Sequence, residues 1–401
     1  MGANMELSKK AQSIESSVTL AITAKAKELK ESGVDIVSFS AGEPDFNTPK
    51  NIIDAAIKAM ENGNTKYTNT NGVISLREAI CKKFKDDNGL VYNPSQIVVS
   101  TGAKQSIANA LLAILNPGDE VIIPTPYWVS YPELVALADG KAVFVESHEE
   151  YSYKFTKENL EKVVTSKTKA IILNTPNNPT GAVYSRSELV EIAEFAEKYN
   201  LIIISDEIYE KLIYGEKKHI SIASISQDAY ERTIVINGLS KSYAMTGWRL
   251  GYCGASEKIA RLMTNIQSHM TSNVWSITQY AAIEALSGPQ DKVNEMIIEF
   301  EKRRDYMVET LKNIKKFSII EPEGAFYIMI NIDKCLGKEI NGQKIENSMD
   351  FSSKLLEYEK VAVIPGKAFG LDNYIRVSYA TSMELIEKGL KRINKFIDKL
   401  K

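Results

Sequence analysis

Short apolar runs alternate with longer amphipathic stretches between about residue 95 and residue 290. The apolar runs cover residues 97–100, 120–124, 170–174, 201–205 and 233–237. Each of the first four runs is followed by a segment with the spacing of apolar residues that is typical of a helix. After the fourth run, residues 201–205, this spacing predicts a helix over residues 206–212. Continuous apolar strands separated by helices are typical of a parallel sheet that helices cover on both faces. We therefore predict an α/β fold with a mostly parallel main sheet.

The pattern changes after residue 290. Residues 293–314 predict one long amphipathic helix, and we expect its basic run, residues 302–304, to face solvent. Shorter strand-like and helical runs then alternate up to a polar C-terminal helix, and residues 34–40 form a further strand-like run. We therefore predict a large domain of residues 46–288 and a smaller α+β domain of residues 1–45, with an N-terminal arm, and 289–401.

Composition narrows the classes of function. The chain has 401 residues, of which 44% are hydrophobic and 25% charged, as in ordinary globular proteins. A net charge of -2 predicts no nucleic-acid partner, and the absence of a long apolar run predicts no membrane span. The three cysteines form no CxxC pair and the three histidines lie far apart, so we expect a cytoplasmic protein without a metal site.

Chemically useful side chains follow one predicted strand after another. In parallel sheets ligands bind beyond the carboxyl ends of the strands, where these side chains would gather. Polar, aromatic and ionisable groups of this kind suit one aromatic ligand that carries a phosphate. The residues are Gly102, Ala103, Lys104, Tyr127, Trp128, Asn178, Asp206, Tyr209, Ser240 and Lys241.

Lys241 lies in a serine- and glycine-rich turn just after the last apolar run, with Arg249 eight positions on. A lysine amine can form a Schiff base with an aldehyde, and an arginine can hold a phosphate. Pyridoxal phosphate carries both groups. Gly102 and Ala103, between a strand and a helix, and the Ser240 hydroxyl would complete a phosphate site. The alternative is that Lys241 is a solvated surface charge.

Other candidates each have a structural alternative. Asp206 ends a buried strand and would pair with a protonated pyridine nitrogen, or else cap a helix. Tyr209 and Asn178 would bond the phenolic oxygen of the ring, or else pack in the core and form a turn. Trp128 would flank the substrate or fill the core. Arg376, inside an apolar strand, would bind a substrate carboxylate or form an internal ion pair.

Taken together, the motifs are specific. The chain resembles class I aminotransferases of pyridoxal phosphate fold type I, and more narrowly the bacterial branch of aspartate aminotransferases, from about residue 5 to the C-terminus. The resemblance is carried by SAGEPDF, KYTNTNG, STGAKQ, PTPYWVSYPE, NTPNNPTGAVY, SDEIYE, GLSKSYAMTGWRLGY, EGAFY and YIRVSYA.

The resemblance implies roles for the matching residues. Lys241 would be the Schiff-base lysine and the proton shuttle, with Asp206 on the pyridine nitrogen and Tyr209 on the phenolic oxygen. Tyr67 would reach the phosphate of a neighbouring subunit, which implies a homodimer with shared active sites. The phosphate would also lie among Gly102, Ala103, Lys104, Ser240 and Arg249, and the substrate among Gly42, Trp128, Asn178 and Arg376.

The implied reaction is ping-pong transfer of the amino group of L-aspartate to 2-oxoglutarate, giving oxaloacetate and L-glutamate. In this branch Lys104, helped by Ser17 and Thr19, would bind the side-chain carboxylate. Relatives that also accept prephenate carry Lys-Pro where this chain has Glu15 and Ser16, so we do not expect that activity.

Three alternatives stay open at this point. An aromatic-amino-acid aminotransferase would differ only in its side-chain pocket. A pyridoxal-phosphate-dependent C–S β-lyase would keep Lys241 and Asp206 but would need no oxo-acid acceptor. A non-enzymatic regulator would need a basic helix-turn-helix before the domain, for which the first 45 residues look too short.

Overall fold

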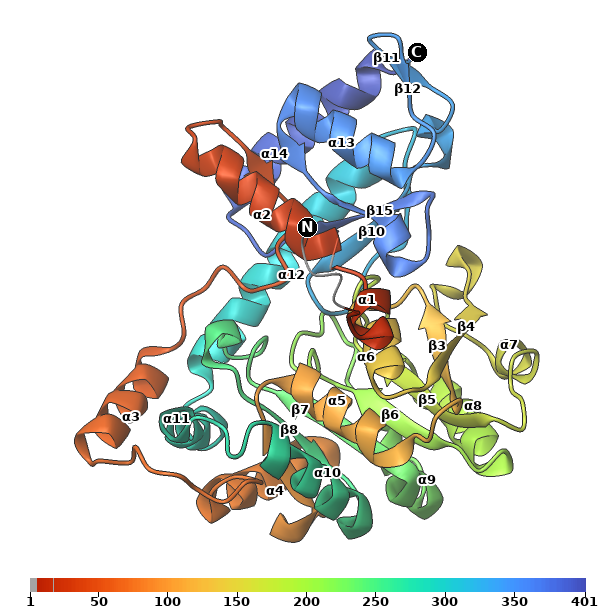
Figure 1. The fold of residues 1–401 in the computed structure, drawn as a ribbon. Helices are drawn as coiled ribbons and strands as arrows, with labels where there is room; N and C mark the ends of the chain where they lie inside the picture. Colours follow the sequence, from red (N-terminus) through yellow and green to blue (C-terminus); the bar gives the residue numbers. More distant parts are fainter. Residues whose placement is uncertain (1–5, 17) are drawn as a thin grey trace.

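The structure is a computed structural model that describes residues 6–16 and 18–401. Figure 1 shows two bodies, each built around its own sheet, with α12 (Asp291–Lys312) running from one body into the other. None of the helices in these ranges is long and apolar enough to cross a membrane. The domain bounds at residues 46 and 288 stay a prediction.

The larger sheet has seven strands within the described chain, in the order β2-β8-β7-β6-β5-β3-β4. Only β8 runs antiparallel to its two neighbours, so the predicted mostly parallel sheet is confirmed. The strands are β2 (Ile97–Ser100), β3 (Glu120–Thr125), β4 (Lys141–Glu146), β5 (Thr168–Asn174), β6 (Ile202–Asp206), β7 (Thr233–Gly238) and β8 (Gly251–Gly254).

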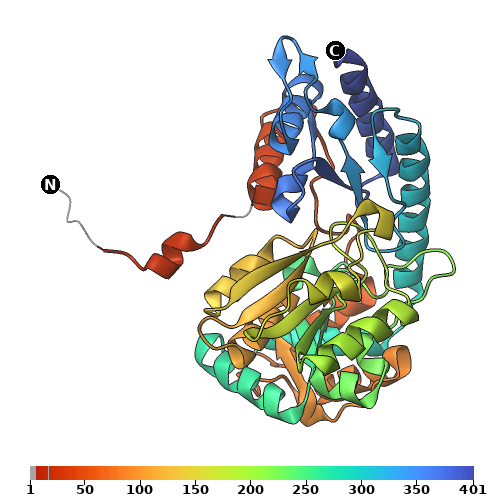
Figure 2. The ribbon, with the colours of Figure 1, turned by 90° about the vertical axis from the view of Figure 1, so that its right-hand side faces the viewer.

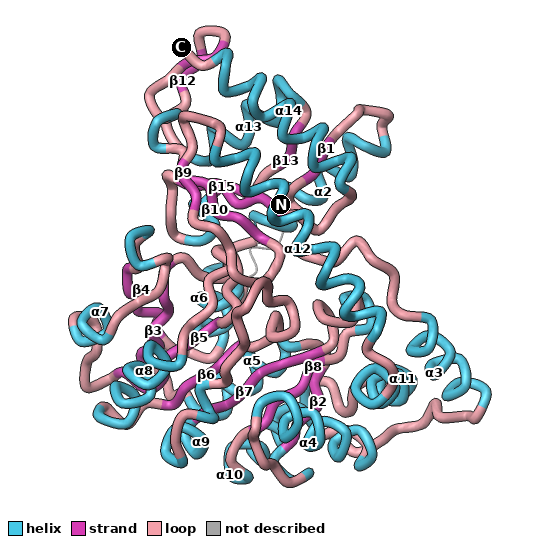
Figure 3. The backbone as a smooth tube through the Cα atoms, turned by 180° about the vertical axis from the view of Figure 1, so that it is seen from behind, coloured by secondary structure: helices cyan, strands magenta, loops and turns pink. Residues whose placement is uncertain are grey.

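Helices cover both faces of this sheet because successive strand residues point to opposite sides. In β5, Ile172 packs toward α5, α6 and α10, whereas Ile171 and Leu173 pack toward α8. Figure 3 shows the strands (magenta) flanked by helices (cyan). The helices of this body are α3 (Lys50–Glu61), α4 (Ile74–Asn88), α5 (Ala103–Ile114), α6 (Ser130–Leu137), α7 (Lys157–Glu161), α8 (Arg186–Lys198), α9 (Gln227–Arg232), α10 (Glu257–Met270) and α11 (Ser276–Ser287).

The smaller body is built on an antiparallel sheet in the order β14-β15-β10-β9, and β1 adds a parallel pair with β13. The strand-like run at residues 34–40 therefore does join this body. Its elements are α2 (Val18–Glu31), β1 (Val37–Ser38), β9 (Ser318–Ile319), β10 (Tyr327–Asn331), β11 (Glu339–Ile340), β12 (Gln343–Lys344), α13 (Ser348–Glu359), β13 (Val361–Ala362), β14 (Ile364–Pro365), β15 (Tyr374–Ser378) and α14 (Met383–Lys399).

Residues 6–16 form an arm. Figure 2 shows its short helix α1 (Lys9–Ser13), in red, to one side of the two bodies. Lys10 pairs with Asp139 of the larger body at 2.7 Å, and the Glu15 N–H donates to a carboxylate oxygen of Glu133. These contacts lie beside α6.

The helix predicted over residues 206–212 is wrong, because the chain forms a tight turn there. The N–H groups of Glu210 and Leu212 donate three residues back, to Glu207 and Tyr209. The turn then brings Ile213 into a bridge with Gly324 of the smaller body. Pairing with another segment thus overrides the local helical pattern.

The expectation that residues 302–304 face solvent is also wrong for two of the three. Arg303 and Arg304 are 6% and 8% exposed. Arg303 pairs with Asp45 at 2.7 Å and with Glu299 at 3.0 Å, and Arg304 pairs with Asp305 at 2.6 Å. Their guanidinium groups lie over the Phe46 and Tyr214 rings while acids satisfy their charges, so charge pairing outweighs the solvation of the run.

Candidate active site

A cavity of about 420 Å³ lies beyond the carboxyl ends of the larger sheet and is also lined by residues of β10 and β15. Of the predicted residues, it is lined by Thr19, Gly42, Ala103, Lys104, Trp128, Asn178, Asp206, Tyr209, Ser240, Lys241, Arg249 and Arg376. Gly102 lies directly behind Arg249. Tyr67 does not line the cavity, and its side chain is 92% exposed. Ser17 lies outside the described residues.

Lys241 is half-buried in the turn after β7 and points its amine into the cavity. Its Nζ donates to the carbonyl oxygen of Gly42. Burial lowers the pKa of Lys241 to about 8. Among the described residues no carboxylate lies within ion-pair distance of this amine. A substantial share of the amine is therefore neutral near physiological pH, as a nucleophile requires.

Asp206 ends β6 and is 4% exposed. Its Oδ2 accepts from the Tyr131 hydroxyl at 2.7 Å, and its Oδ1 accepts from the Ile208 N–H at 3.3 Å. Burial raises the pKa of Asp206 to about 6. Because no helix follows Asp206, the capping alternative is excluded. The carboxylate is thus held by donors, and among the described residues it forms no ion pair, which a protonated ring nitrogen would supply.

An anion cradle lies at the N-terminus of α5. Gly102, at φ 81°, caps this helix, and a Cβ there would lie 2.6 Å from Nη2 of Arg249. A Cβ on Gly251 would lie 2.2 Å from the Ala103 nitrogen, so β8 holds the turn closely. The positive end of the helix and the exposed Arg249 guanidinium therefore face one place, and Ser240 lines the same cavity. This geometry suits a phosphate.

Arg376 reaches the cavity from β15 and is 3% exposed. Its Nη1 donates to Oδ1 of Asn178 at 3.0 Å, and its Nη2 donates to the Ser40 carbonyl oxygen at 3.1 Å. Its Nε has no partner in the structure, and within the described ranges no carboxylate pairs with it. The internal ion pair considered for Arg376 is therefore absent, and a buried guanidinium faces a cavity without an anion.

Lys104 and Trp128 line the same cavity. The Lys104 Nζ lies 4.9 Å from the centroid of the Trp128 ring. Burial, and then the charge of Arg249, lower the pKa of Lys104. Thr19 and Leu20, from the first turn of α2, line this cavity too. A second anionic group therefore has a cationic partner available there.

Sequence reasoning missed three residues that the fold brings to the cavity: Tyr131, Asn174 and Tyr327. The Tyr131 hydroxyl holds Asp206, and the side chain of Asn174 donates to the backbone oxygen of Asp206 at 2.9 Å. The Tyr327 hydroxyl lies 3.0 Å from that of Tyr209. The PYWVSYPE and EGAFY motifs contain both tyrosines, but their spacing alone does not reveal their partners.

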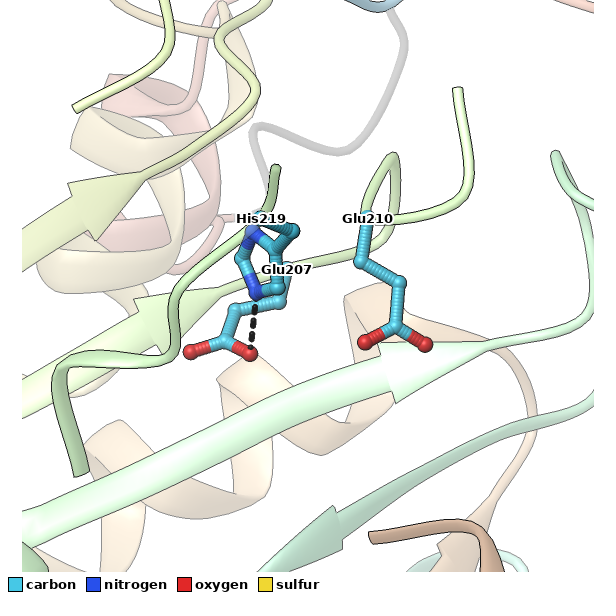
Figure 4. A group of neighbouring side chains, drawn as sticks. All are labelled: Glu207, Glu210 and His219. Carbon is cyan, nitrogen blue, oxygen red and sulfur yellow. Dashed lines mark hydrogen bonds and ion pairs between the residues drawn. The ribbon is translucent and has the colours of Figure 1, made fainter. Parts of the chain in front are cut away.

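Behind the turn after β6 lies a buried polar cluster of Glu207, Glu210 and His219 (Figure 4). His219 Nε2 lies 2.8 Å from Glu207 Oε2, and the Ser221 hydroxyl donates to Oε1 at 2.7 Å. Glu210 forms an ion pair with Lys83 of α4, and both side chains are at most 5% exposed. The carboxylates are thus already satisfied by protein groups, and the cluster anchors the turn that carries Asp206.

This geometry agrees with comparisons to known proteins. The sequence model of the family described as aminotransferase class I and II matches residues 34–393. An aspartate aminotransferase of Bacillus subtilis is 49% identical over 399 residues, which cover 98% of this chain and 100% of the relative. A probable aspartate/prephenate aminotransferase of Rickettsia conorii is 50% identical and covers 98% of both chains.

Solved structures give the same result. The aspartate aminotransferase of Rhizobium meliloti has a TM-score of 0.96 at 40% identity, covering 99% of this chain and 100% of that one. The Thermus thermophilus aspartate aminotransferase with maleate has a TM-score of 0.92 at 38% identity, covering 98% and 99%. The fold is therefore that of a transaminase. The chain belongs to the class I and II aminotransferase family.

Proposed function

We propose that the chain uses pyridoxal phosphate to transfer the amino group of L-aspartate to 2-oxoglutarate, giving oxaloacetate and L-glutamate. One observation carries this proposal: a buried Arg376 with no carboxylate partner among the described residues faces the same cavity as the Lys241 amine. An amino acid offers a carboxylate that the guanidinium would bind and an α-proton that the amine would accept.

The cavity residues fit the cofactor at both of its ends. The cradle of Gly102, Ser240 and Arg249 would hold the phosphate. The buried carboxylate of Asp206, which accepts hydrogen bonds from neutral donors, would hold the ring nitrogen. Tyr209 and Asn178 line the same cavity and would bond the phenolic oxygen. When bound, pyridoxal phosphate supplies an electron sink for the charge left on the substrate α-carbon.

The chain's own residues then bind and move protons. Arg376 binds and orients the α-carboxylate, helped by the Asn178 amide that already contacts it. Lys241, once its amine is free, would accept the α-proton of the substrate at Nζ and would then donate it to a carbon of the bound cofactor. A pKa of about 8 suits a group that must both accept and donate a proton near neutral pH.

Preference for a dicarboxylic substrate follows from the second cation. Lys104, against the Trp128 ring, lines the cavity that Arg376 reaches from β15, and Thr19 is also among the lining residues. The Bacillus subtilis and Thermus thermophilus proteins, both named aspartate aminotransferase, support this assignment. The names of the Rickettsia relatives add prephenate, but Glu15 and Ser16 leave that activity outside the proposal.

We further propose a cytoplasmic homodimer with shared active sites. Tyr67 supports this, because its side chain is 92% exposed and lies away from the cavity of its own chain, where a partner subunit could receive it. The free cysteines Cys81, Cys253 and Cys335 suit a reducing compartment. The expected ligands are an amino acid and a 2-oxo acid.

Steady-state kinetics test the function. With L-aspartate and 2-oxoglutarate varied together, we expect the parallel double-reciprocal lines of a ping-pong reaction. Replacing Lys104 with methionine should lower kcat/KM for L-aspartate about 10- to 100-fold more than for L-tyrosine, because it removes only the second cation. Equal losses for both substrates would contradict the dicarboxylate assignment, and release of ammonia without an acceptor would favour a lyase.

A further inference from the structure

Tyr327 joins the two bodies of the molecule at the cavity. It begins β10 of the smaller sheet, whereas Tyr209 comes from the turn after β6 of the larger one. Their hydroxyl oxygens lie 3.0 Å apart, and the residues are 1% and 3% exposed. This hydrogen bond therefore connects two segments that are 118 positions apart in the chain, through two buried hydroxyl groups.

The ring of Tyr327 also contacts the substrate-binding arginine of the proposed function. The guanidinium carbon of Arg376 lies 4.3 Å from the Tyr327 ring centroid and 4.9 Å from that of Phe369. Tyr327 and Arg376 lie on paired antiparallel strands, β10 and β15. Cation–π contact thus holds the guanidinium in place, and no carboxylate in the described part of the chain pairs with it.

We propose that Tyr327 is a positioning residue that links Arg376 to Tyr209, so that a carboxylate bound at Arg376 changes the strength with which Tyr209 donates into the cavity. This inference rests on the proposed function, in which Tyr209 donates to the phenolic oxygen of the cofactor.

The hydrogen bond between the two phenols can orient their protons. Each phenol has one proton to donate and lone pairs to accept. If the Tyr327 hydroxyl donates to the Tyr209 oxygen, the Tyr209 proton stays available for an acceptor in the cavity. Hydrogen bonds in such a chain polarise one another, so the first bond strengthens the second. Tyr209 without Tyr327 would be a weaker and less well oriented donor.

Nearby charges also affect the Tyr327 hydroxyl. The charged and titratable groups that act on Tyr327 are Arg376 from β15, Tyr209 from the turn after β6, and Glu43 from the segment after β1. Burial raises the pKa of Tyr327, while the positive charge of Arg376 opposes this and makes the hydroxyl a better donor. A carboxylate on Arg376 offsets that charge. Substrate binding therefore weakens the donor chain that ends at Tyr209.

The test measures the protonation of the Lys241 Schiff base in the holoenzyme by absorbance. Tyr327→Phe should raise its apparent pKa by about one-half to one unit, because the phenolate oxygen loses part of its hydrogen bonding. Saturating maleate, a dicarboxylate that cannot be transaminated, should raise the wild-type pKa, and the rise should be smaller in Tyr327→Phe. Tyr184→Phe is the control, since this buried hydroxyl contacts the Phe155 N–H away from the cavity.

A double-mutant cycle separates this role from a general effect on folding. In a Tyr209→Phe background, Tyr327→Phe should cause no further change, because its effect passes through Tyr209. Additive shifts, or a wild-type titration unchanged by Tyr327→Phe with and without maleate, would overturn the inference while leaving the proposed function intact. A wild-type protein that forms no Schiff-base band would overturn the proposed function and this inference together.

Discussion

The Nη1 group of Arg376 donates to Oδ1 of Asn178 at 3.0 Å, which ties β15 of the smaller sheet to the loop after β5 of the larger one. Because the amide oxygen is occupied by the guanidinium, its NH₂ group is left to donate elsewhere in the cavity. One contact therefore orients a proposed carboxylate ligand and a proposed cofactor ligand at the same time.

Arg376→Lys should lower kcat/KM for L-aspartate about 100- to 1,000-fold, mainly through KM. A lysine keeps the charge but cannot form the two parallel bonds of a guanidinium with a carboxylate. The matched control is Arg392→Lys, whose guanidinium pairs with Asp35 on the far side of the smaller body. Equal kinetics for Arg376→Lys and wild type would place the substrate carboxylate elsewhere.

Asp206 should reduce the stability of the apoprotein at neutral pH. Its folded-state pKa of about 6 lies above the ordinary value of 3.8, so the folded state binds the proton more tightly. The free energy of unfolding therefore falls as pH rises from about 4 to about 6, by about 2 to 3 kcal/mol for this nearly inaccessible group.

It follows that apo Asp206→Asn should be more stable than wild type at pH 8 and equal to it near pH 4 in urea unfolding at one protein concentration. Pyridoxal phosphate should then stabilise wild type more than the variant, because only the carboxylate pairs with a protonated ring nitrogen. Lower stability of the apo variant at pH 8 would show that the carboxylate already has a cation partner.

The reactivity of Lys241 should follow its lowered pKa. Only the neutral amine attacks an aldehyde, and burial places the pKa of Lys241 at about 8. The rate constant for uptake of pyridoxal phosphate by the apoprotein should rise about tenfold per pH unit below that value and level off above it. Stopped-flow absorbance measures this rate. A midpoint near the ordinary lysine value of 10.5 would contradict the described environment.

Much of the site could be predicted because it depends on topology that the pattern of apolar runs already reveals. Asp206 and Lys241 follow β6 and β7, and parallel strands bring their carboxyl ends to one edge. Strand β8 was not predicted, since the run Gly251–Gly254 is short and contains two glycines. Both glycines are needed for close contacts, because a Cβ on Gly254 would meet the Tyr92 ring at 2.7 Å.

Contacts between distant segments could not be predicted in the same way. Nothing in the spacing around Tyr209 indicates that its hydroxyl lies against Tyr327. Likewise, Arg303 looks like part of a solvated basic run until the fold brings Asp45 to it. Partners of this kind depend on how the two bodies pack, which local periodicity does not encode.

The buried pair Lys83–Glu210 should be important for stability. Burial alone would raise the pKa of Glu210, but the charges of Lys83 and His219 lower this pKa to about 2. This contribution is present above the ordinary value of 4.5 and is lost as pH falls toward 2. Lys83→Met should cost about 3 to 5 kcal/mol, because it leaves a buried carboxylate unpaired.

Lys82→Met is the matched control for that change. Lys82 is the neighbouring residue of α4 and pairs with Asp86, but these side chains are 73% and 51% exposed. Because solvent screens such a pair, it contributes little to stability. Urea unfolding at pH 7 measures the free energy of unfolding of both variants. Equal decreases for the two would mean that solvent reaches the Lys83–Glu210 pair.

The most direct test of the central claim is an absorbance spectrum of the purified holoenzyme, before and after L-aspartate is added without any oxo-acid acceptor. We predict a near-visible Schiff-base band that moves to shorter wavelength with L-aspartate and returns with 2-oxoglutarate. Such a cycle would show the cofactor, the half-reaction and the dicarboxylic substrates in one experiment. A band that L-aspartate leaves unchanged would contradict the substrate, and no band after incubation with pyridoxal phosphate would contradict the role of Lys241.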